Sequence, residues 1–221
     1  MLFFTDRSDA GRRLASRLKH LRAQHPVVLA LPRGGVPVGL EVARALDAPL
    51  DLVLVRKIGA PDQPELAMGA VAEGDPPELV VDQRLQQMLG VSDDELDAAK
   101  TREIAELHRR RAAYLGDRPH VPIEGRAVIV VDDGLATGAT MRAAVQAIRR
   151  RAPSRLVVAV PVASPEGLRR VGRAADETVC LQTPATFFGV GQFYRQFSQL
   201  TDQEVVELLA QAAGFGQTEV S

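Results

Sequence analysis

The order of apolar and polar positions along the chain predicts strands and helices in alternation. Continuous apolar runs of strand length, typical of strands covered on both faces, occupy residues 27–31, 50–56, 128–131, 155–161 and 177–181. Shorter strands are predicted at 67–72 and 78–81. Apolar residues recur at helical spacing over 8–22, over 36–47 and from Gly138 onward. This alternation predicts an α/β fold with a doubly wound, mainly parallel sheet.

Local capping chemistry predicts three further helices. Ser92-Asp-Asp-Glu95 is a capping box that opens a long polar helix running to about Tyr114, and Thr201-Asp-Gln-Glu204 opens a C-terminal helix. Ser164-Pro-Glu opens a short one. Residues 57–64 are predicted as a loop because they contain Gly59, Pro61 and Pro64.

Composition favours a soluble cytoplasmic protein. The net charge of −1 gives no global field for nucleic acid, and the only cysteine, Cys180, excludes an intramolecular disulfide. The apolar runs are too short for a membrane span, and Met1–Phe4 is too short for a signal peptide. Without repeats or linkers, residues 1–221 are expected to form a single domain, with a helical insertion at about 82–120 and a C-terminal tail over 183–221, of which about 183–200 could cover a site as a hood.

The segment 128–140, Val-Ile-Val-Val-Asp-Asp-Gly-Leu-Ala-Thr-Gly-Ala-Thr, carries the strongest functional signal. Asp132 and Asp133 follow a buried strand, and ligands of open α/β sheets bind beyond the carboxyl ends of strands. A loop of small residues at a helix N-terminus suits a phosphate. Carboxylates would repel a neighbouring phosphate, so their presence indicates a different ligand group, such as sugar hydroxyls or a divalent cation. The segment therefore predicts a sugar-phosphate site, and the alternative is an ordinary helix cap.

Two other strand ends carry groups that suit phosphate oxygens. Arg33-Gly34-Gly35 follows the first core strand, where glycines allow close backbone approach and arginine offers a planar fork. Arg56-Lys57 ends the next strand, and Lys57 is one of only three lysines. The alternatives are a common turn and solvated strand-end charges.

Other polar groups are interpreted as surface features. We see no His-Asp or Cys-His pairing, and the four histidines are expected on the surface. The basic run His108-Arg-Arg-Arg111 follows Glu103 and Glu106 on the same helix, which favours a solvated face over a nucleic-acid site.

The 128–140 segment resembles the phosphoribosyl pyrophosphate (PRPP) motif of type I phosphoribosyltransferases. The resemblance implies that Asp132 and Asp133 hold the ribose hydroxyls, directly or through Mg²⁺. It also implies that backbone N–H groups and hydroxyls of five residues wrap the 5′-phosphate: Ala136, Thr137, Gly138, Ala139 and Thr140.

The resemblance also gives the other two strand ends a role in binding pyrophosphate. Arg33, Gly34 and Gly35 stand where the family has its pyrophosphate loop, which often holds a non-proline cis peptide; we place it at Pro32–Arg33. Arg56 and Lys57 stand before the family's mobile loop, so they would reach pyrophosphate as it closes, and Glu65 is a weaker candidate there.

The implied activity is Mg²⁺-dependent transfer of the phosphoribosyl group from PRPP to a nitrogenous base, by a homodimer. The resemblance covers about residues 26–73 and 125–162. Ala136 replaces the acidic residue of hypoxanthine–guanine enzymes, and no base-contacting lysine occurs within 160–164, so the acceptor stays open. Two other functions remain possible: a PRPP-binding regulator without turnover, and a different phosphate-ester enzyme or binding module.

In the family a variable hood covers the base. The candidate hood is 186–197, which holds five of the nine aromatic residues. Most of these are expected in the core, and Phe188 and Tyr194 are the candidates for the base side.

Overall fold

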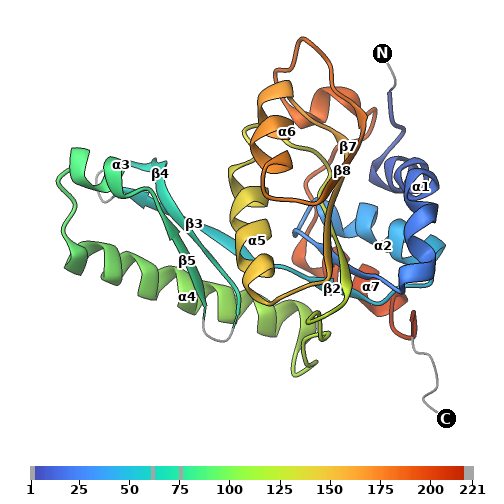
Figure 1. Ribbon diagram of the computed structural model, residues 1–221, viewed down its shortest axis with the longest axis horizontal. Coiled ribbons are helices and arrows are strands. Elements are labelled where there is room, and N and C mark those ends of the chain that lie inside the picture. Colours follow the sequence, from blue (N-terminus) through green and yellow to red (C-terminus); the bar gives the residue numbers. More distant parts are fainter. Residues whose placement is uncertain (1–2, 61–62, 75–76, 217–221) are drawn as a thin grey trace.

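The centre of the molecule is a five-stranded sheet whose neighbouring strands all run parallel. The structure is a computed structural model that describes residues 3–60, 63–74 and 77–216, without the side chains of 63–65 and 67. The strand order is β2-β1-β6-β7-β8. The strands are β1 (Val27–Ala30), β2 (Leu50–Leu52), β6 (Ala127–Val131), β7 (Arg155–Val162) and β8 (Glu177–Gln182). The predicted mainly parallel sheet is therefore confirmed for the core (Figure 1).

Helices cover both faces of this sheet. One face carries α5 (Ala139–Arg150) and α6 (Pro165–Gly172), and the other carries α1 (Arg7–Leu18), α2 (Gly35–Leu46) and α7 (Asp202–Gln211). Successive β6 residues show why: Val128 packs toward α5, and Ile129 packs toward α2. A strand buried on both faces needs apolar residues at every position, so the continuous apolar runs arise from a doubly wound fold.

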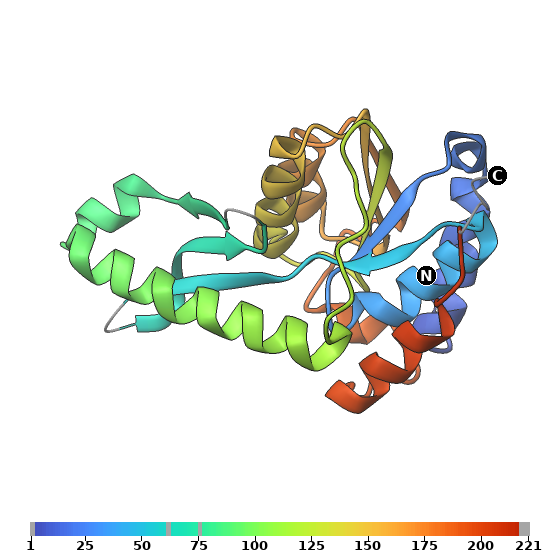
Figure 2. The same cartoon turned by 90° about the horizontal axis from the view of Figure 1, so that it is seen from below.

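Residues 55–115 form an arm that projects from the core (Figures 1 and 2). Three antiparallel strands in the order β3-β4-β5 make its sheet: β3 (Val55–Ala60), β4 (Gln63–Ala72) and β5 (Glu78–Val81). The short α3 (Gln83–Met88) follows, and α4 (Asp93–Leu115) then runs back along the arm. The predicted capping box at Ser92 is present.

The arm corrects two predictions. The apolar run 50–56 is not one strand, because β2 ends at Leu52 and β3 begins at Val55, where the chain leaves the parallel sheet. The predicted loop 57–64 is wrong for Lys57–Ala60, which belong to β3, and for Gln63, which begins β4. The local sequence offers these residues no hydrogen-bond partners of its own, and pairing of β3 with β4 supplies partners for their backbone N–H and C=O groups. The insertion at 82–120 is thus the helical half of a mixed α/β arm.

Buried charges join the arm to the core. Glu73, which directly follows β4, forms an ion pair with Arg111, whose Nε lies 3.1 Å from the carboxylate. The same carboxylate lies 3.3 Å from Nε2 of His120. Asp51 of β2 is almost fully buried and accepts from the backbone N–H of Val121 at 2.9 Å. These contacts hold Glu73 against α4 and the segment that follows α4, and they hold β2 against the same segment. All four histidines have exposed side chains, as predicted.

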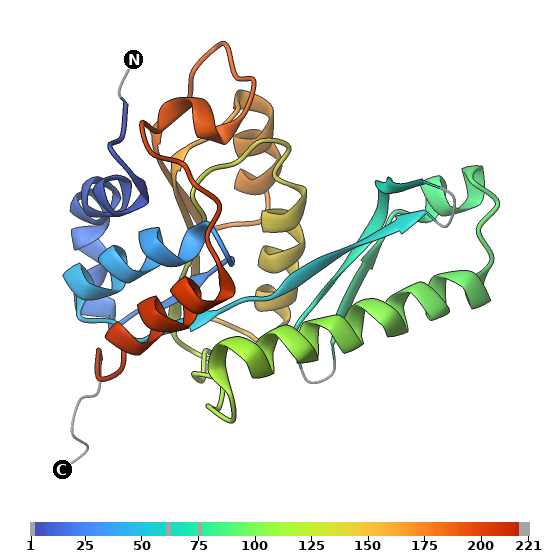
Figure 3. The same ribbon diagram turned by 180° about the vertical axis from the view of Figure 1, so that it is seen from behind.

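The N-terminal segment and the tail after β8 pack on each other. Phe4 forms an isolated parallel bridge with Tyr194, and the two rings lie 5.3 Å apart. The 3₁₀ helix η2 (Val190–Phe193) contributes Phe193, which is fully buried. The helix predicted over 8–22 ends at Leu18 and continues as the 3₁₀ helix η1 (Lys19–Gln24). The tail then descends to α7, which begins at its capping box (Figure 3).

Candidate functional site

Two adjacent carboxylates stand at the carboxyl end of β6, the central strand. Asp132 accepts a hydrogen bond from the backbone N–H of Asp133 through its Oδ1 at 2.8 Å. Burial, together with the charge of Asp133, raises the pKa of Asp132 well above its ordinary value. Burial also raises the pKa of Asp133, and Arg7 opposes this rise. Two ionisable groups therefore share a desolvated position, a condition that the fold alone does not require.

The Pro32–Gly35 loop packs directly against these carboxylates. A Cβ placed on Gly34 would lie 2.0 Å from Oδ2 of Asp133, and one on Gly35 would lie 2.7 Å from the carbonyl oxygen of Val131. At Gly35 the close atoms are backbone, so only glycine fits there, whereas a side chain at Gly34 would displace the Asp133 carboxylate. The Pro32–Arg33 peptide is cis, as predicted. The structure thus brings together the residues after β1 and β6.

The 136–140 loop leads into α5 and leaves donors free. Gly138 is the N-cap residue of α5 and has φ +72°, a left-handed conformation that favours glycine. Ala136 and Thr137 are exposed. Within the part of the chain that the structure describes, the backbone N–H groups of residues 136–138 donate to no acceptor. This loop therefore has the free N–H groups that an anion needs.

The loop is held from behind by the N-terminus of α6. The hydroxyl of Ser164 donates to the carbonyl oxygen of Ala136 and accepts from the N–H of Gly167. A Cβ on Gly167 would clash with that same carbonyl oxygen. The contacts occupy a carbonyl group, so the N–H groups of the loop stay available.

Arg56 and Lys57 lie on β3 and share a cavity with the 136–140 loop. The cavity has a volume of about 450 Å³ and is bounded by β3, by α4 and by Thr140 at the start of α5. Arg56 Nε pairs with Glu103 of α4 at 2.7 Å. Lys57 is exposed. The side chain of Glu65 lies outside the described residues.

Arg33 contacts a charged group that the sequence did not single out. Its Nη1 lies 3.6 Å from Oδ1 of Asp202, the first residue of α7. The same oxygen accepts a 2.7 Å hydrogen bond from the hydroxyl of Tyr114, at the end of α4. Burial and the hydrogen bond to Asp202 raise the pKa of Tyr114 to about 12. Three elements, the Pro32–Gly35 loop, α7 and α4, therefore meet at one carboxylate.

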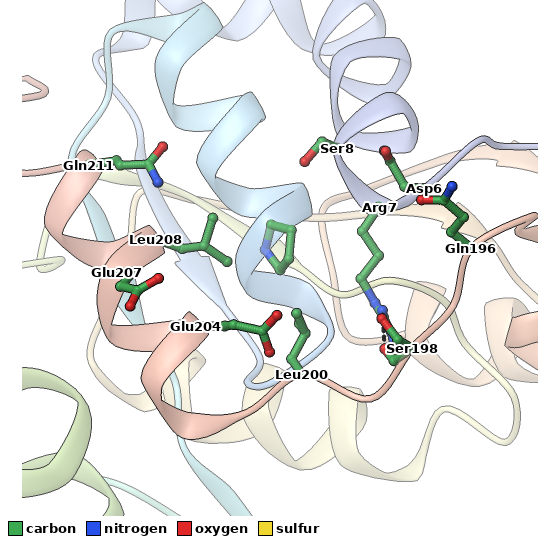
Figure 4. Close-up of a pocket in the computed structure, with 11 residues that line it drawn as sticks. Asp6, Arg7, Ser8, Gln196, Ser198, Leu200, Glu204, Glu207, Leu208 and Gln211 are labelled. Carbon is green, nitrogen blue, oxygen red and sulfur yellow. Dashed lines mark hydrogen bonds between the residues drawn. The ribbon is translucent and has the colours of Figure 1, made fainter.

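Arg7 is the site residue that sequence reasoning missed. Its Nε donates to Oδ2 of Asp133 at 2.8 Å, and its Nη1 donates to the carbonyl oxygen of Ser198 at 2.8 Å. The guanidinium lies over the ring of Phe197, 3.9 Å from the centroid. Figure 4 shows it reaching from α1 toward Ser198, beside a pocket of about 300 Å³ between α1 and α7. An arginine in the first turn of an amphipathic helix carries no local signal of this role.

The two aromatic candidates occupy different places. Tyr194 is 6% exposed, and its hydroxyl donates to the carbonyl oxygen of Asp133 at 2.6 Å, so it supports the motif from within the core. Burial raises its pKa. Phe188 is 89% exposed. The expectation that most aromatics of 186–197 are core residues is confirmed, because Phe193 is fully buried and Phe187 and Phe197 pack against it and Tyr194.

Two other expectations can be compared with the structure. In the basic run of α4, Arg109 and Arg110 pair with Glu106 at the surface, as expected for a solvated face. The prediction is wrong for Arg111, whose mostly buried side chain pairs with the buried Glu73. Among the helices of the described residues, none combines the length and the apolar character that a membrane crossing requires.

Comparisons with known proteins identify relatives of this chain. A crystal structure of the Thermus thermophilus protein TT1426 superposes with a TM-score of 0.83 and 45% sequence identity, over 95% of this chain and 99% of that one. Two Mycobacterium tuberculosis proteins, from strains CDC 1551 and H37Rv and each named "Putative phosphoribosyl transferase", are 46% identical over 96% of this chain. The chain spans about half, 47%, of their length.

The family model of the phosphoribosyl transferase domain matches residues 6–198. The match is wider than the 26–73 and 125–162 expected from motifs, and it takes in Arg7, the arm and the tail that holds Tyr194. The chain belongs to the phosphoribosyl transferase domain family.

Proposed function

We propose that the protein is a Mg²⁺-dependent phosphoribosyltransferase that moves the 5-phosphoribosyl group of PRPP to a nitrogenous base and releases pyrophosphate. The observation that carries this proposal is the contact of Gly34 with Asp133. It joins a loop suited to pyrophosphate to carboxylates suited to ribose hydroxyls, next to a loop with free N–H groups. A sugar that bears phosphate at both ends matches this order of groups.

Each part of PRPP has a proposed partner. The 5′-phosphate would bind the N–H groups and hydroxyls of 136–140, and the ribose hydroxyls would bind Asp132 and Asp133. Pyrophosphate would bind Arg33, the N–H group of Gly34, and the side chains of Arg56 and Lys57. The N–H group of Gly35 donates to the carbonyl oxygen of Leu31 at 2.9 Å, so Gly35 would contribute close backbone approach. Displacement at the ribose C1 needs no protein nucleophile, so the residues act by holding the leaving group and orienting the sugar.

Asp132 and Asp133 are also the proposed holders of Mg²⁺. Carboxylate oxygens suit this ion, which usually keeps several waters and binds one or two carboxylates together with substrate phosphates. Arg7 pairs only with Asp133, so a cation beside Asp132 would offset the desolvated charge. In the described part of the chain, no group of three His, Cys, Asp or Glu side chains could hold a metal. When bound, Mg²⁺ would neutralise charge on the pyrophosphate.

The acceptor and the assembly complete the proposal. Phe188, exposed on the tail after β8, is the candidate for stacking on a planar base, and Tyr194 would act from beneath the motif. Residues 1–221 are proposed to act as one domain within a homodimer. Light scattering of the purified protein tests the dimer, since a monomer at assay concentration contradicts it.

A two-stage experiment tests the function. Calorimetry with PRPP and Mg²⁺ should show binding that Asp133→Asn weakens and that Asp117→Asn, at an exposed position, leaves unchanged. Pyrophosphate release is then measured with free purines, pyrimidines, orotate and small amines. Absence of PRPP binding contradicts the proposal, and binding without release for any acceptor favours a PRPP sensor.

A further inference from the structure

The cavity between β3 and α4 holds a cationic residue to which no role has been given. We propose that Arg102, on the arm helix α4, binds the pyrophosphate part of the substrate, so that the arm completes the anion site of the core. This inference rests on the proposed function and extends it to an element outside the sheet.

The geometry of the cavity supports this role. Its walls are the edge of β3 and one face of α4, and Thr140 of the 136–140 loop closes one side. A ligand on the 136–140 loop would therefore extend toward the arm. A volume of about 450 Å³ is large enough for a diphosphate with its water shell.

The sequence of α4 explains how Arg102 reaches this place. Ala99, Arg102 and Glu103 stand at positions i, i+3 and i+4, so they share one face of the helix. Ala99 is buried and fixes that face toward β3. Its small side chain lets the helix approach closely, and the longer side chains beside it extend along the cavity wall.

The charges around the cavity are unbalanced. Arg56, Lys57 and Arg102 bring three positive charges, and Glu103 brings one negative charge that is already paired with Arg56 at 2.7 Å. Within the described residues, neither Lys57 nor Arg102 has a carboxylate partner. Two cations without counterions that face one cavity match a ligand with two or more negative charges.

The pairing of Arg56 with Glu103 allows the role of charge to be tested by removing either a positive or a negative charge from the cavity. A diphosphate that binds Arg56 competes with Glu103 for the same guanidinium. Loss of the Arg102 charge should therefore weaken the ligand, and loss of the Glu103 charge should leave its affinity equal or higher. A purely structural role of this helix face would make both substitutions weaken binding.

The experiment is calorimetry of the full chain with Mg²⁺–PRPP and, separately, with Mg²⁺–pyrophosphate. Arg102→Gln is expected to weaken both ligands about tenfold, which corresponds to about 1.4 kcal/mol. Glu103→Gln is expected to bind equally well or up to about threefold more tightly. Arg84→Gln is the matched control, since it removes the same charge from an exposed arm position outside the cavity. Circular dichroism checks that each variant is folded.

Four results have distinct meanings. Weaker binding in Arg102→Gln alone supports the inference. Unchanged binding in Arg102→Gln, with normal PRPP binding by the unsubstituted protein, overturns the inference and leaves the proposed function intact. Equal losses of affinity in Arg102→Gln and Glu103→Gln overturn the inference, because they indicate a structural role of this helix face. Pyrophosphate binding that depends on Arg102 without any PRPP binding supports the anion site and contradicts the proposed function.

Discussion

Arg7 Nε donates a 2.8 Å hydrogen bond to Asp133 Oδ2, although 126 positions separate the two residues in the chain. Both side chains are mostly buried, with 11% and 13% of their surfaces exposed. The guanidinium also bonds to the carbonyl oxygen of Ser198. Arg7 therefore links the N-terminal helix, the tail after β8 and the motif carboxylate, so that Asp133 is held both by its side chain and, through Tyr194, by its backbone.

Replacement of Arg7 should uncouple this linkage. Arg7→Gln leaves the Asp133 carboxylate without its counterion, and removal of one partner of a buried pair costs about 3 kcal/mol of folding free energy. We expect PRPP affinity to fall with it. Arg7→Lys should recover part of both losses, because lysine keeps the charge but not the fork or the ring contact. Urea denaturation and calorimetry check this, with Arg17→Gln, an exposed residue of the same helix, as the control. Wild-type stability in Arg7→Gln would contradict it.

Asp132→Asn should stabilise the protein at neutral pH while it removes PRPP binding. Burial and the charge of Asp133 raise the pKa of Asp132 above its ordinary value. A carboxyl with a raised pKa contributes its stability below the ordinary pKa and loses it as the pH rises through the raised value. Asparagine avoids that loss, and its Oδ1 can still accept from the Asp133 N–H.

The expected gain is about 1 kcal/mol at pH 7, or about 2–4 °C in the melting temperature. Thermal unfolding at pH 7 and near pH 4 measures it. The gain should shrink at the lower pH, because Asp132 of the unsubstituted protein is then protonated and as neutral as the asparagine that replaces it. An equal gain at the two pH values would show that charge is not its source.

Gly34→Ala tests the contact between the two loops. The new Cβ would lie 2.0 Å from Asp133 Oδ2, so the carboxylate or the loop must move. Overpacking of this kind costs about 1–3 kcal/mol, and we expect PRPP affinity to fall as Asp133 is displaced. Gly172→Ala is a matched control, because its Cβ would lie 3.7 Å from the nearest heavy atom. Similar effects of the two substitutions would contradict a specific contact.

Local chemistry explains which features the sequence could predict. The parallel core strands were visible because strands covered on both faces need unbroken apolar runs, as in 128–131. The helices that begin after Ser92 and Thr201 could be predicted because a capping box is complete within four residues. The 128–140 segment likewise holds a strand end, carboxylates and loop within thirteen consecutive positions.

Features that depend on distant partners could not be predicted in this way. Lys57–Ala60 became a strand because β4 pairs with it, although its own glycine and the prolines that follow are typical of a loop. Arg7 and Asp202 contact site residues only after the N-terminal helix and α7 have packed on the core. The roles proposed for Lys57, Arg33 and Phe188 stay predictions until binding is measured.

Tyr114 provides a test of the junction between α4 and α7. Its hydroxyl donates to Asp202 at 2.7 Å, and burial together with this bond raises its pKa from the ordinary 10 to about 12. Because the folded pKa is the higher one, the contribution of Tyr114 to stability is complete below pH 10 and is lost as the pH rises toward 12. Stability above pH 10 should therefore fall less steeply in Tyr114→Phe.

Absorbance near 295 nm measures this directly, because the chain has only two tyrosines and no tryptophan. In Tyr194→Phe the single remaining tyrosine should stay neutral at pH 10 and ionise near 12. Asp202→Asn should lower that midpoint, because it removes the charge that disfavours tyrosinate. Circular dichroism at each pH separates titration of the folded protein from alkaline unfolding. A midpoint near 10 in the folded protein would mean that α7 does not hold Asp202 against Tyr114.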